Sequence, residues 1–261
     1  MTDRKGEENG TETEGRFYRA GFVARGTLSF RVELAERAWT TFTPGQYAYL
    51  EWIAPPLTDE KGNGRNFSIV SPPADLPVLT FATRLTGSAF KKNLETLPDG
   101  TPIRVDGPFG TFCLPERFSS TRPFAWEKPV VFVAGGIGVT PFMSMLRDGL
   151  SRLKAISFYL FTTNRTLEDS AFQGEIEELS RHHKNLFLGQ FVSQAARPLP
   201  HGIEVVRLTP DHLFEAIGEK ARNGDFYIAG PPSMVSSFKV ALLGAGVLSE
   251  RIHVDPFLGY F

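Results

Sequence analysis

The sequence of 261 residues predicts two domains: an antiparallel β-barrel of about six strands, followed by an α/β domain built on a parallel sheet. In the first half, short runs of β-branched and aromatic residues alternate with Gly and Pro at even spacing, which is typical of a small closed barrel. In the second half, apolar strands alternate with amphipathic helices, which indicates a parallel sheet covered on both faces.

The predicted boundaries follow changes in composition. Residues 1–15 are polar, rich in Glu, Thr and Gly, and show no periodicity, so we expect a disordered tail. The barrel domain then covers residues 16–118, and the α/β domain covers residues 129–261. Between them, residues 119–128 form a polar stretch that contains a proline, and we expect a linker there.

One short helix interrupts the strands expected in the first half. Ser88 is a candidate N-cap for it, and the spacing of Phe90 and Leu94 places both on one helix face. The expected strands cover residues 17–25, 27–34, 46–52, 67–70, 78–85 and 103–106.

The second half alternates strands with helices, as a parallel sheet requires, because each parallel pair needs a crossover connection. The expected strands cover residues 129–134, 156–162, 186–192, 203–208, 226–229 and 252–254. The expected helices cover residues 140–153, 170–182, 210–221 and 232–243.

Composition argues against several classes of function. The formal net charge of −1 provides no overall basic field that would attract nucleic acid or an anionic membrane. No apolar run approaches the roughly 20 residues that cross a bilayer. The polar start of the chain does not resemble a signal peptide, so we expect a cytoplasmic protein without a transmembrane segment.

Metal chemistry is not expected either. The single cysteine, Cys113, allows no disulfide within the chain and no iron–sulfur cluster, which needs about four thiolates. His182 and His183 are adjacent and therefore point to different sides of a helix, so they do not form a metal-binding pair.

A glycine-rich turn follows the first apolar strand of the second half. Gly135, Gly136 and Gly138 permit a tight turn and a close approach of a ligand to the backbone. Thr140 suits an N-cap, and Pro141 suits the first helical position. Free N–H groups and the helix dipole favour an anionic group there, such as the pyrophosphate of NADH or NADPH. A tight turn with nothing bound is the alternative interpretation.

A second turn repeats this strand-to-helix pattern. Gly230, Pro231 and Pro232 follow an apolar strand, and Met234 lies in the helix expected after them. Both turns come at the carboxyl ends of parallel strands, which line the crevice where open α/β sheets bind ligands. A strand that is simply stopped by proline is the alternative.

The end of the second parallel strand faces the adenosine ribose in a doubly wound sheet. Here it reads Thr162-Thr163-Asn164-Arg165, without the Asp or Glu that would bind the ribose hydroxyls. Asn164 and Arg165 are candidates for nucleotide binding. Arg165 either meets a 2′-phosphate or is a solvated loop charge, so the choice between NADH and NADPH stays open.

The first half carries a candidate flavin site at Arg65-Asn66-Phe67-Ser68. An Arg at a strand entrance can hold a phosphate through two parallel hydrogen bonds. Phe67 offers a flat apolar surface. The Ser68 hydroxyl can donate or accept a hydrogen bond, which suits a ring nitrogen that changes protonation during redox chemistry. Taken alone, a surface charge is the commoner explanation for Arg65, and core packing is the commoner one for Phe67.

The helix that starts near Ser88 is a candidate for binding a pyrophosphate at its N-terminus. FAD carries such a pyrophosphate, and FMN, with a single phosphate, is the alternative flavin. The cofactor-binding candidates around this helix are Thr83, Arg84, Ser88, Ala89, Phe90 and Lys91.

Five short motifs occur in a fixed order. They are Arg65 to Ser68, Gly107 to Gly110, Gly135 to Pro141, Gly230 to Pro232 and Asp255 to Tyr260. Over nearly the whole chain this order resembles the ferredoxin–NADP reductase superfamily. That family has an Arg-x-Tyr-Ser flavin motif, a Gly-Pro-Phe-Gly barrel exit, a Gly-Gly-x-Gly-x-Thr-Pro nucleotide motif, a Gly-Pro-Pro and, in single-chain bacterial members, a Glu-x-Phe-x-Gly-Tyr tail. Gly110, which ends the second motif, joins the cofactor-binding candidates.

The resemblance implies a flavin-binding antiparallel barrel and a five-stranded parallel NAD(P)-binding domain, with the two cofactors meeting where the domains adjoin. It places Arg65 on the flavin phosphate, Ser68 near flavin N5 and Phe67 against the isoalloxazine. Phe257 or Tyr260 would cover the flavin face that the nicotinamide reaches. Ser68 and these two aromatic residues are therefore the catalytic candidates.

The chain departs from the family pattern at several positions. Phe67 replaces Tyr and lacks the phenol that would bond the ribityl chain. The family's Gly-x-x-Ser pyrophosphate stretch reads Thr86 to Lys91, Thr-Gly-Ser-Ala-Phe-Lys. Ala229 stands where plant-type members carry Cys, and Asp255 stands in place of Glu.

These observations predict a flavin-dependent NAD(P)H oxidoreductase, in which hydride passes from the nicotinamide to FAD and electrons continue to a separate acceptor. We expect no iron–sulfur domain in this chain, since the thiolates for it are missing, so the acceptor is a small redox protein or a diffusible molecule. Two alternatives stay open: an electron-transfer subunit of a multicomponent oxygenase or similar complex, and a flavoprotein redox sensor without turnover.

Overall fold

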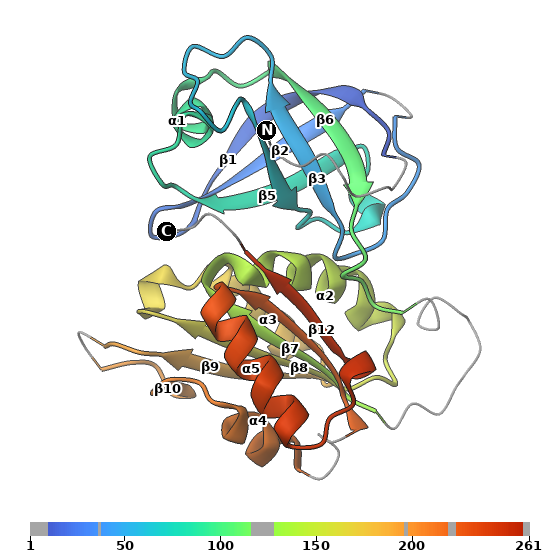
Figure 1. The fold of residues 1–261 in the computed structure, drawn as a ribbon, viewed down its shortest axis with the longest axis vertical. Coiled ribbons are helices and arrows are strands. Elements are labelled where there is room, and N and C mark those ends of the chain that lie inside the picture. The colour runs from blue at the N-terminus through green and yellow to red at the C-terminus, as the bar shows by residue number, and fades with distance from the viewer. Residues whose placement is uncertain (1–9, 36–37, 116–127, 196–197, 219–222, 258–261) are drawn as a thin grey trace. The chain divides into compact units, whose positions relative to one another are not determined.

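The computed structural model describes residues 10–35, 38–115, 128–195, 198–218 and 223–257 (Figure 1). The chain divides into two compact units. The first unit consists of Met1–Leu114 with Met143–Asp148, and the second of Pro115–Phe142 with Gly149–Phe261. The linker expected at residues 119–128 lies outside the described residues, apart from Lys128.

The first unit contains the expected six-stranded antiparallel sheet, with strand order β4-β3-β6-β1-β2-β5. Beyond the last residue of β4, the Val70 N–H donates to the Thr80 carbonyl of β5 at 2.8 Å, which brings the two edge strands together. The strands are β1 (Thr13–Ala24), β2 (Thr27–Leu34), β3 (Tyr47–Trp52), β4 (Gly64–Ser68), β5 (Val78–Arg84) and β6 (Thr101–Phe109).

Two strands of the first unit start at least three residues before the expected position. The strand β1 begins at Thr13, which pairs with Val105 of β6, so the boundary of the expected tail at residue 15 was too late. The strand β4 begins at Gly64, whereas the expected strand covered residues 67–70. It therefore includes Arg65. Strand pairing explains both differences. Each added segment pairs with a neighbouring strand, and hydrophobic periodicity alone does not reveal such pairing.

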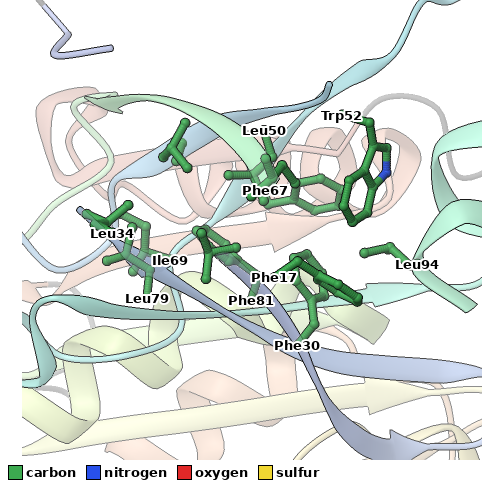
Figure 2. Packing of buried hydrophobic residues seen from close by; sticks show 14 of the residues in the cluster. Phe17, Phe30, Leu34, Leu50, Trp52, Phe67, Ile69, Leu79, Phe81 and Leu94 are labelled. Atoms are coloured by element: carbon green, nitrogen blue, oxygen red, sulfur yellow. The ribbon is translucent and has the colours of Figure 1, made fainter. Parts of the chain in front are cut away.

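The core of the first unit is rich in aromatic rings (Figure 2). The ring of Phe67 lies 5.6 Å from that of Phe30 and 5.2 Å from that of Phe90, between centroids. Helix α1 (Ala89–Thr96) is fastened to β3 by the indole N–H of Trp52, which donates to the Phe90 carbonyl at 3.2 Å. The start of α1 is therefore fixed on a rigid sheet.

The second unit contains a six-stranded parallel sheet with strand order β10-β9-β8-β7-β11-β12. The count of five that the family resemblance implied is one too low, because the three-residue strand β10 pairs with β9 at the sheet edge. The strands are β7 (Val130–Gly135), β8 (Phe158–Asn164), β9 (Leu186–Val192), β10 (Ile203–Val205), β11 (Asp225–Gly230) and β12 (Ile252–Pro256).

Helices cover both faces of this sheet. One face packs Val131 of β7 and Ile228 of β11 with apolar residues of the fourth and fifth helices. On the other face, Phe132 stacks on Phe142 of the second helix, with ring centroids 4.7 Å apart. The helices are α2 (Thr140–Arg152), α3 (Gln173–His182), α4 (Pro210–Ile217) and α5 (Pro232–Gly244). Within the described residues, no helix has both the length and the apolar character needed to cross a membrane.

Candidate functional site

The side chain of Arg65 makes a dense set of contacts in the first unit. Its Nη1 donates to the carbonyls of Lys61, Gly62 and Gly64 at 3.0, 2.8 and 2.7 Å. Its Nη2 donates to both carboxylate oxygens of Asp59, at 2.9 and 3.1 Å. The guanidinium is thus held in a fixed orientation and directed at an anion, here the Asp59 carboxylate.

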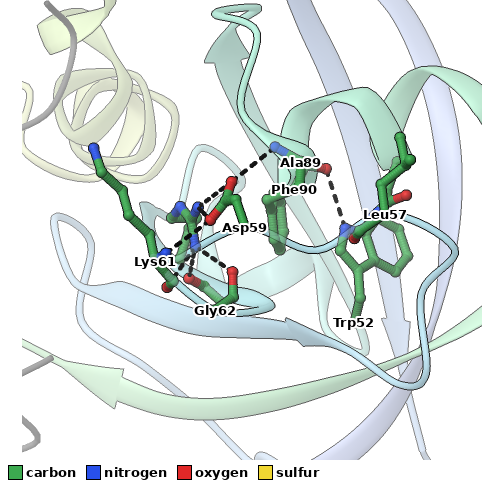
Figure 3. Close-up of polar contacts among 10 residues, drawn as sticks. Trp52, Leu57, Asp59, Lys61, Gly62, Ala89 and Phe90 are labelled. Carbon is green, nitrogen blue, oxygen red and sulfur yellow. Dashed lines mark hydrogen bonds and ion pairs between the residues drawn. The ribbon is translucent and has the colours of Figure 1, made fainter. Parts of the chain in front are cut away.

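The same carboxylate also receives backbone donors (Figure 3). The Ala89 N–H at the start of α1 donates to Asp59 Oδ2 at 2.8 Å, and the Lys61 N–H donates to Oδ1 at 2.9 Å. Burial alone would raise the pKa of Asp59, but the N–H of Ala89, the guanidinium of Arg65 and the N–H of Lys61 together hold it below its usual value. These donors form a site for an oxyanion.

Lys91 adds a cation to this site from the first turn of α1. It is 7% exposed, and its Nζ donates to Thr86 Oγ1 at 3.1 Å. Burial, and then the positive charges of Arg65 and Lys61, lower the pKa of Lys91 to about 8. The single charge of Asp59 therefore leaves an excess of positive charge around the site.

Ser88 occupies the expected N-cap position of α1. Its backbone is extended, as a cap requires, but its hydroxyl makes no capping bond. Ser88 Oγ is buried and has no hydrogen-bond partner within the described residues. An orphaned hydroxyl beside Arg65, Lys91 and a helix N-terminus fits the pyrophosphate of FAD, which would supply acceptors for all of them.

Other candidates in the first unit divide between surface and core. Asn66 and Arg84 are exposed, and Ser68 is half-buried with no hydrogen bond to its hydroxyl from any described residue. Thr83 is fully buried, and its hydroxyl reaches the Arg84 carbonyl at 3.5 Å. Gly110 lies beyond β6, where its carbonyl accepts from Gln46 Nε2 at 3.3 Å.

Phe67 does not present an exposed surface on which a flavin could stack, and its position agrees with the alternative of core packing. Its side chain is 4% exposed and lies in the core of the first unit (Figure 2). The pleat of β4 explains this, because Phe67 points to the buried face while Asn66 and Ser68 on either side point away from it. Phe90 is equally buried, so only its backbone is available to a ligand.

The glycine-rich turn of the second unit continues directly into helix. Residues Gly136–Val139 form a short 3-10 helix, and α2 begins at Thr140. Val139 occupies the N-cap position, so the expected N-cap role of Thr140 is wrong. The Thr140 hydroxyl instead donates to the Ile137 carbonyl at 3.0 Å, because the chain is already helical before α2 starts.

The two glycine turns of the second unit pack directly against each other. A Cβ on Gly138 would lie 2.3 Å from the Ala229 carbonyl oxygen, and one on Gly230 would lie 2.8 Å from the Gly135 oxygen. Gly135 itself faces Pro231 and Met234 of the second turn. The sequence-predicted residues of both turns are therefore brought together at the ends of β7 and β11.

Gly136 differs from these glycines. It has a φ of +57°, and a Cβ placed there would have no heavy atom within 4 Å. The left-handed backbone requires glycine, while the free space leaves that side of the turn open to a ligand. The turn fits the anionic part of a nicotinamide dinucleotide, with backbone N–H groups as donors.

The chain after β12 lies beside the second turn. The Phe257 N–H donates to the Gly230 carbonyl at 2.9 Å, so Phe257 is fixed near that glycine. In β12, Asp255 pairs with Ala229 of β11. Tyr260, the other aromatic candidate, lies outside the described residues.

Polar side chains at the ends of β8 and β9 include residues that sequence reasoning missed. Gln190 is 8% exposed and its Nε2 has no partner, and Asn164 Oδ1 is likewise buried and unpaired among the described residues. Gln190 pairs with Thr162 in the sheet. Arg165 is exposed and its Nε donates to Gln194 at 3.1 Å. The available signal was a lone polar residue, Gln190, in an apolar strand.

Among the described residues, no three His, Cys, Asp or Glu side chains come together in a way that would hold a metal ion.

Asp59 is a second site residue that the sequence analysis missed. It lies in the polar loop before β4, and nothing in the local sequence indicates that its carboxylate meets Ala89, 30 residues further along the chain.

Comparison with known proteins places the chain in a family. The family model described as "Oxidoreductase NAD-binding domain" matches residues 132–239. Ferredoxin–NADP reductase B of Sorangium cellulosum is 36% identical over 200 residues, which cover 74% of this chain and 78% of that protein. The chain therefore belongs to the ferredoxin–NADP reductase family, and the resemblance expected from its motifs is confirmed.

Two further comparisons describe the extent of the similarity. The reductase component of propane 2-monooxygenase from Rhodococcus jostii is 26% identical over 242 residues, which cover 90% of this chain but only 60% of that protein. A crystal structure of a ferredoxin NADP+ reductase from Neisseria gonorrhoeae, with bound FAD and NADP, has a TM-score of 0.74 at 23% identity and covers 94% of this chain and 98% of that one. The fold is thus shared over most of the chain.

The carboxyl group of Asp255 predicts a pH-dependent stability. Burial raises its pKa to about 6, so the folded chain holds this proton more tightly than the unfolded chain. The protonated carboxyl group therefore stabilises the folded state. This stabilisation is fully present below the unfolded pKa near 4 and is lost as the pH rises to about 6. Asp255→Asn is therefore expected to raise the free energy of unfolding by roughly 2 kcal/mol at neutral pH and to change it little near pH 4.

Urea unfolding at both pH values checks this prediction. Glu250→Gln is the matched control, since it removes the same charge at an exposed position. An equal gain at both pH values would show that burial of the charged carboxylate does not limit stability.

Proposed function

We propose that this chain is a flavin-dependent NAD(P)H reductase that binds FAD in its first unit and NADH or NADPH in its second. One observation carries the proposal. A single chain of the ferredoxin–NADP reductase family holds an oxyanion site of Arg65, Lys91 and the start of α1, and also an open glycine turn at Gly136. FMN, which has one phosphate, is the alternative occupant of the first site.

The bound flavin would accept hydride from the nicotinamide, and the chain's own residues provide binding and orientation. Arg65 and Lys91 hold the phosphate groups, and Ser88 offers them a hydroxyl. The free hydroxyl of Ser68 would bond the flavin ring nitrogen that changes protonation during the reaction. Gly136 and its neighbours present backbone N–H groups to the dinucleotide pyrophosphate. Phe257, fixed beside Gly230, is the described aromatic residue that we assign to the nicotinamide approach.

The direct test is a reduction experiment. Purified protein is expected to be yellow, and the colour should bleach rapidly when NADH or NADPH is added without oxygen. Stopped-flow traces with each nucleotide give the preference, which Arg165 does not decide because its side chain is exposed. A chain that takes up neither FAD nor FMN would contradict the proposal. Bound flavin that bleaches slowly or not at all would favour the redox sensor.

We propose that the electrons continue to a separate acceptor, either a small redox protein or a diffusible molecule. The similarity to an oxygenase reductase component supports a second candidate, an electron-transfer subunit of a larger complex. Turnover with ferricyanide or a quinone separates the two. Rapid bleaching without such turnover would favour the partner-dependent subunit. We also propose a cytoplasmic location, which cell fractionation would test.

Ser68→Ala is expected to leave flavin bound and to slow anaerobic flavin reduction roughly tenfold to a hundredfold. The reason is that the hydroxyl contact matters most as charge develops on the ring nitrogen. Stopped-flow absorbance measures the rate, and Ser151→Ala, at an exposed position of α2, is the matched control. Unchanged reduction kinetics in Ser68→Ala would remove Ser68 from the catalytic site.

A further inference from the structure

We infer that Asp59 is an internal competitor for the flavin phosphate: its carboxylate occupies the oxyanion site of Arg65 and the α1 N-terminus, and the cofactor must displace it. This inference rests on the proposed flavin site and adds a residue that sets its affinity. The groups involved are the Asp59 carboxylate and the donors that bind it, which are Arg65 Nη2 and the N–H groups of Ala89 and Lys61.

The donors that a phosphate needs are already in use. Both Nη atoms of Arg65 are engaged, Nη1 by loop carbonyls and Nη2 by the two oxygens of Asp59. The N–H of Ala89, which opens α1, is directed at the same carboxylate. Both oxygens of Asp59 accept from Nη2 of Arg65, and a phosphate held by Arg65 would need the same donor, so one group excludes the other.

Charge favours the exchange. Asp59 brings one negative charge to a site that includes Arg65, Lys91 and Lys61. The pyrophosphate of FAD carries two negative charges and would balance this cluster better. The N-terminus of α1 also binds Asp59. The helix dipole would stabilise either anion, so the carboxylate and the phosphate compete for the same position.

The loop allows the carboxylate to leave. The Asp59 side chain is 28% exposed, so after rotation it reaches water and needs no new partner inside the protein. It lies before β4 in a segment that makes a left-handed turn at Gly62. Displacement therefore moves a loop side chain and leaves the aromatic core of the first unit unchanged.

The test compares flavin affinities of the full-length chain after its flavin has been removed. Asp59→Asn is expected to bind FAD and FMN roughly fivefold to tenfold more tightly than the original chain, by fluorescence titration. Riboflavin, which lacks a phosphate, should bind equally to both. Glu60→Gln removes the same charge from the exposed neighbouring residue and should change nothing. Asp59→Ala serves as a second variant, and thermal unfolding shows that each variant is folded.

Two outcomes would overturn the inference. Equal or weaker FAD binding by both Asp59 variants would mean that Asp59 positions Arg65 and does not compete with the phosphate. An equal gain for riboflavin would mean that the effect does not act at the phosphate. If no variant binds flavin, the proposed function fails, and calorimetry with inorganic pyrophosphate decides the inference alone: tighter binding by Asp59→Asn supports it, and unchanged binding overturns it.

Discussion

Gly138→Ala is expected to destabilise the chain by about 3 kcal/mol or more, because the added methyl group has no space. The new Cβ would lie 2.3 Å from the Ala229 oxygen, 2.5 Å from its carbonyl carbon and 2.7 Å from the Gly230 nitrogen. All three atoms are backbone, so no side-chain rotation relieves the clash. The ends of β7 and β11 would have to separate, and the nucleotide turn would lose its geometry.

Urea unfolding measures this effect, with two other glycines as controls. Gly174→Ala, in the first turn of α3, meets no atom within 4 Å and is expected to stabilise the chain by roughly 0.5–1 kcal/mol. Gly136→Ala also has open space, but its φ of +57° costs about 1–2 kcal/mol. If Gly138→Ala unfolds at the same urea concentration as the original chain, the close packing of the two turns is not present in solution.

The alternation of residues explains why the fold class could be predicted. Every residue of β7 is buried, as expected for a central parallel strand. The strand β3 alternates between buried and half-buried positions, as expected for an antiparallel strand with one face on a core. The strand β10 was expected within residues 203–208, but its place in the sheet could not be predicted. Its residues are largely exposed, and only pairing with β9 defines it.

The candidate site divides along a similar line. Motifs indicated Arg65, Ser88 and the glycine turns, because these residues depend on local backbone geometry. The motif misled at Phe67, where the pleat of β4 directs the ring into the core. Asp59 could not be found from local sequence, since its importance depends on Ala89, 30 residues further along the chain. A buried polar atom without a partner, as on Gln190, becomes visible only in three dimensions.

Arg65→Ala is expected to weaken FAD binding roughly a hundredfold, which corresponds to about 3 kcal/mol. Arg65 provides the Nη2 donor of the oxyanion site, and its side chain is only 19% exposed, so solvent replaces it poorly. Its loss also releases the loop carbonyls at Lys61 and Gly62 and leaves the Asp59 charge beside α1. Both consequences oppose binding of a phosphate.

Flavin retention after desalting and fluorescence titration of FAD check this prediction. Arg31→Ala, at an exposed position of β2, is the matched control for loss of one positive charge. Arg65→Lys keeps the charge but loses the planar guanidinium, so an intermediate affinity would show that geometry contributes as well as charge. Full flavin retention by Arg65→Ala would remove Arg65 from the phosphate site. In the double variant with Asp59→Asn, the gain from Asp59→Asn should shrink, because the two anions then no longer share the guanidinium for which they compete.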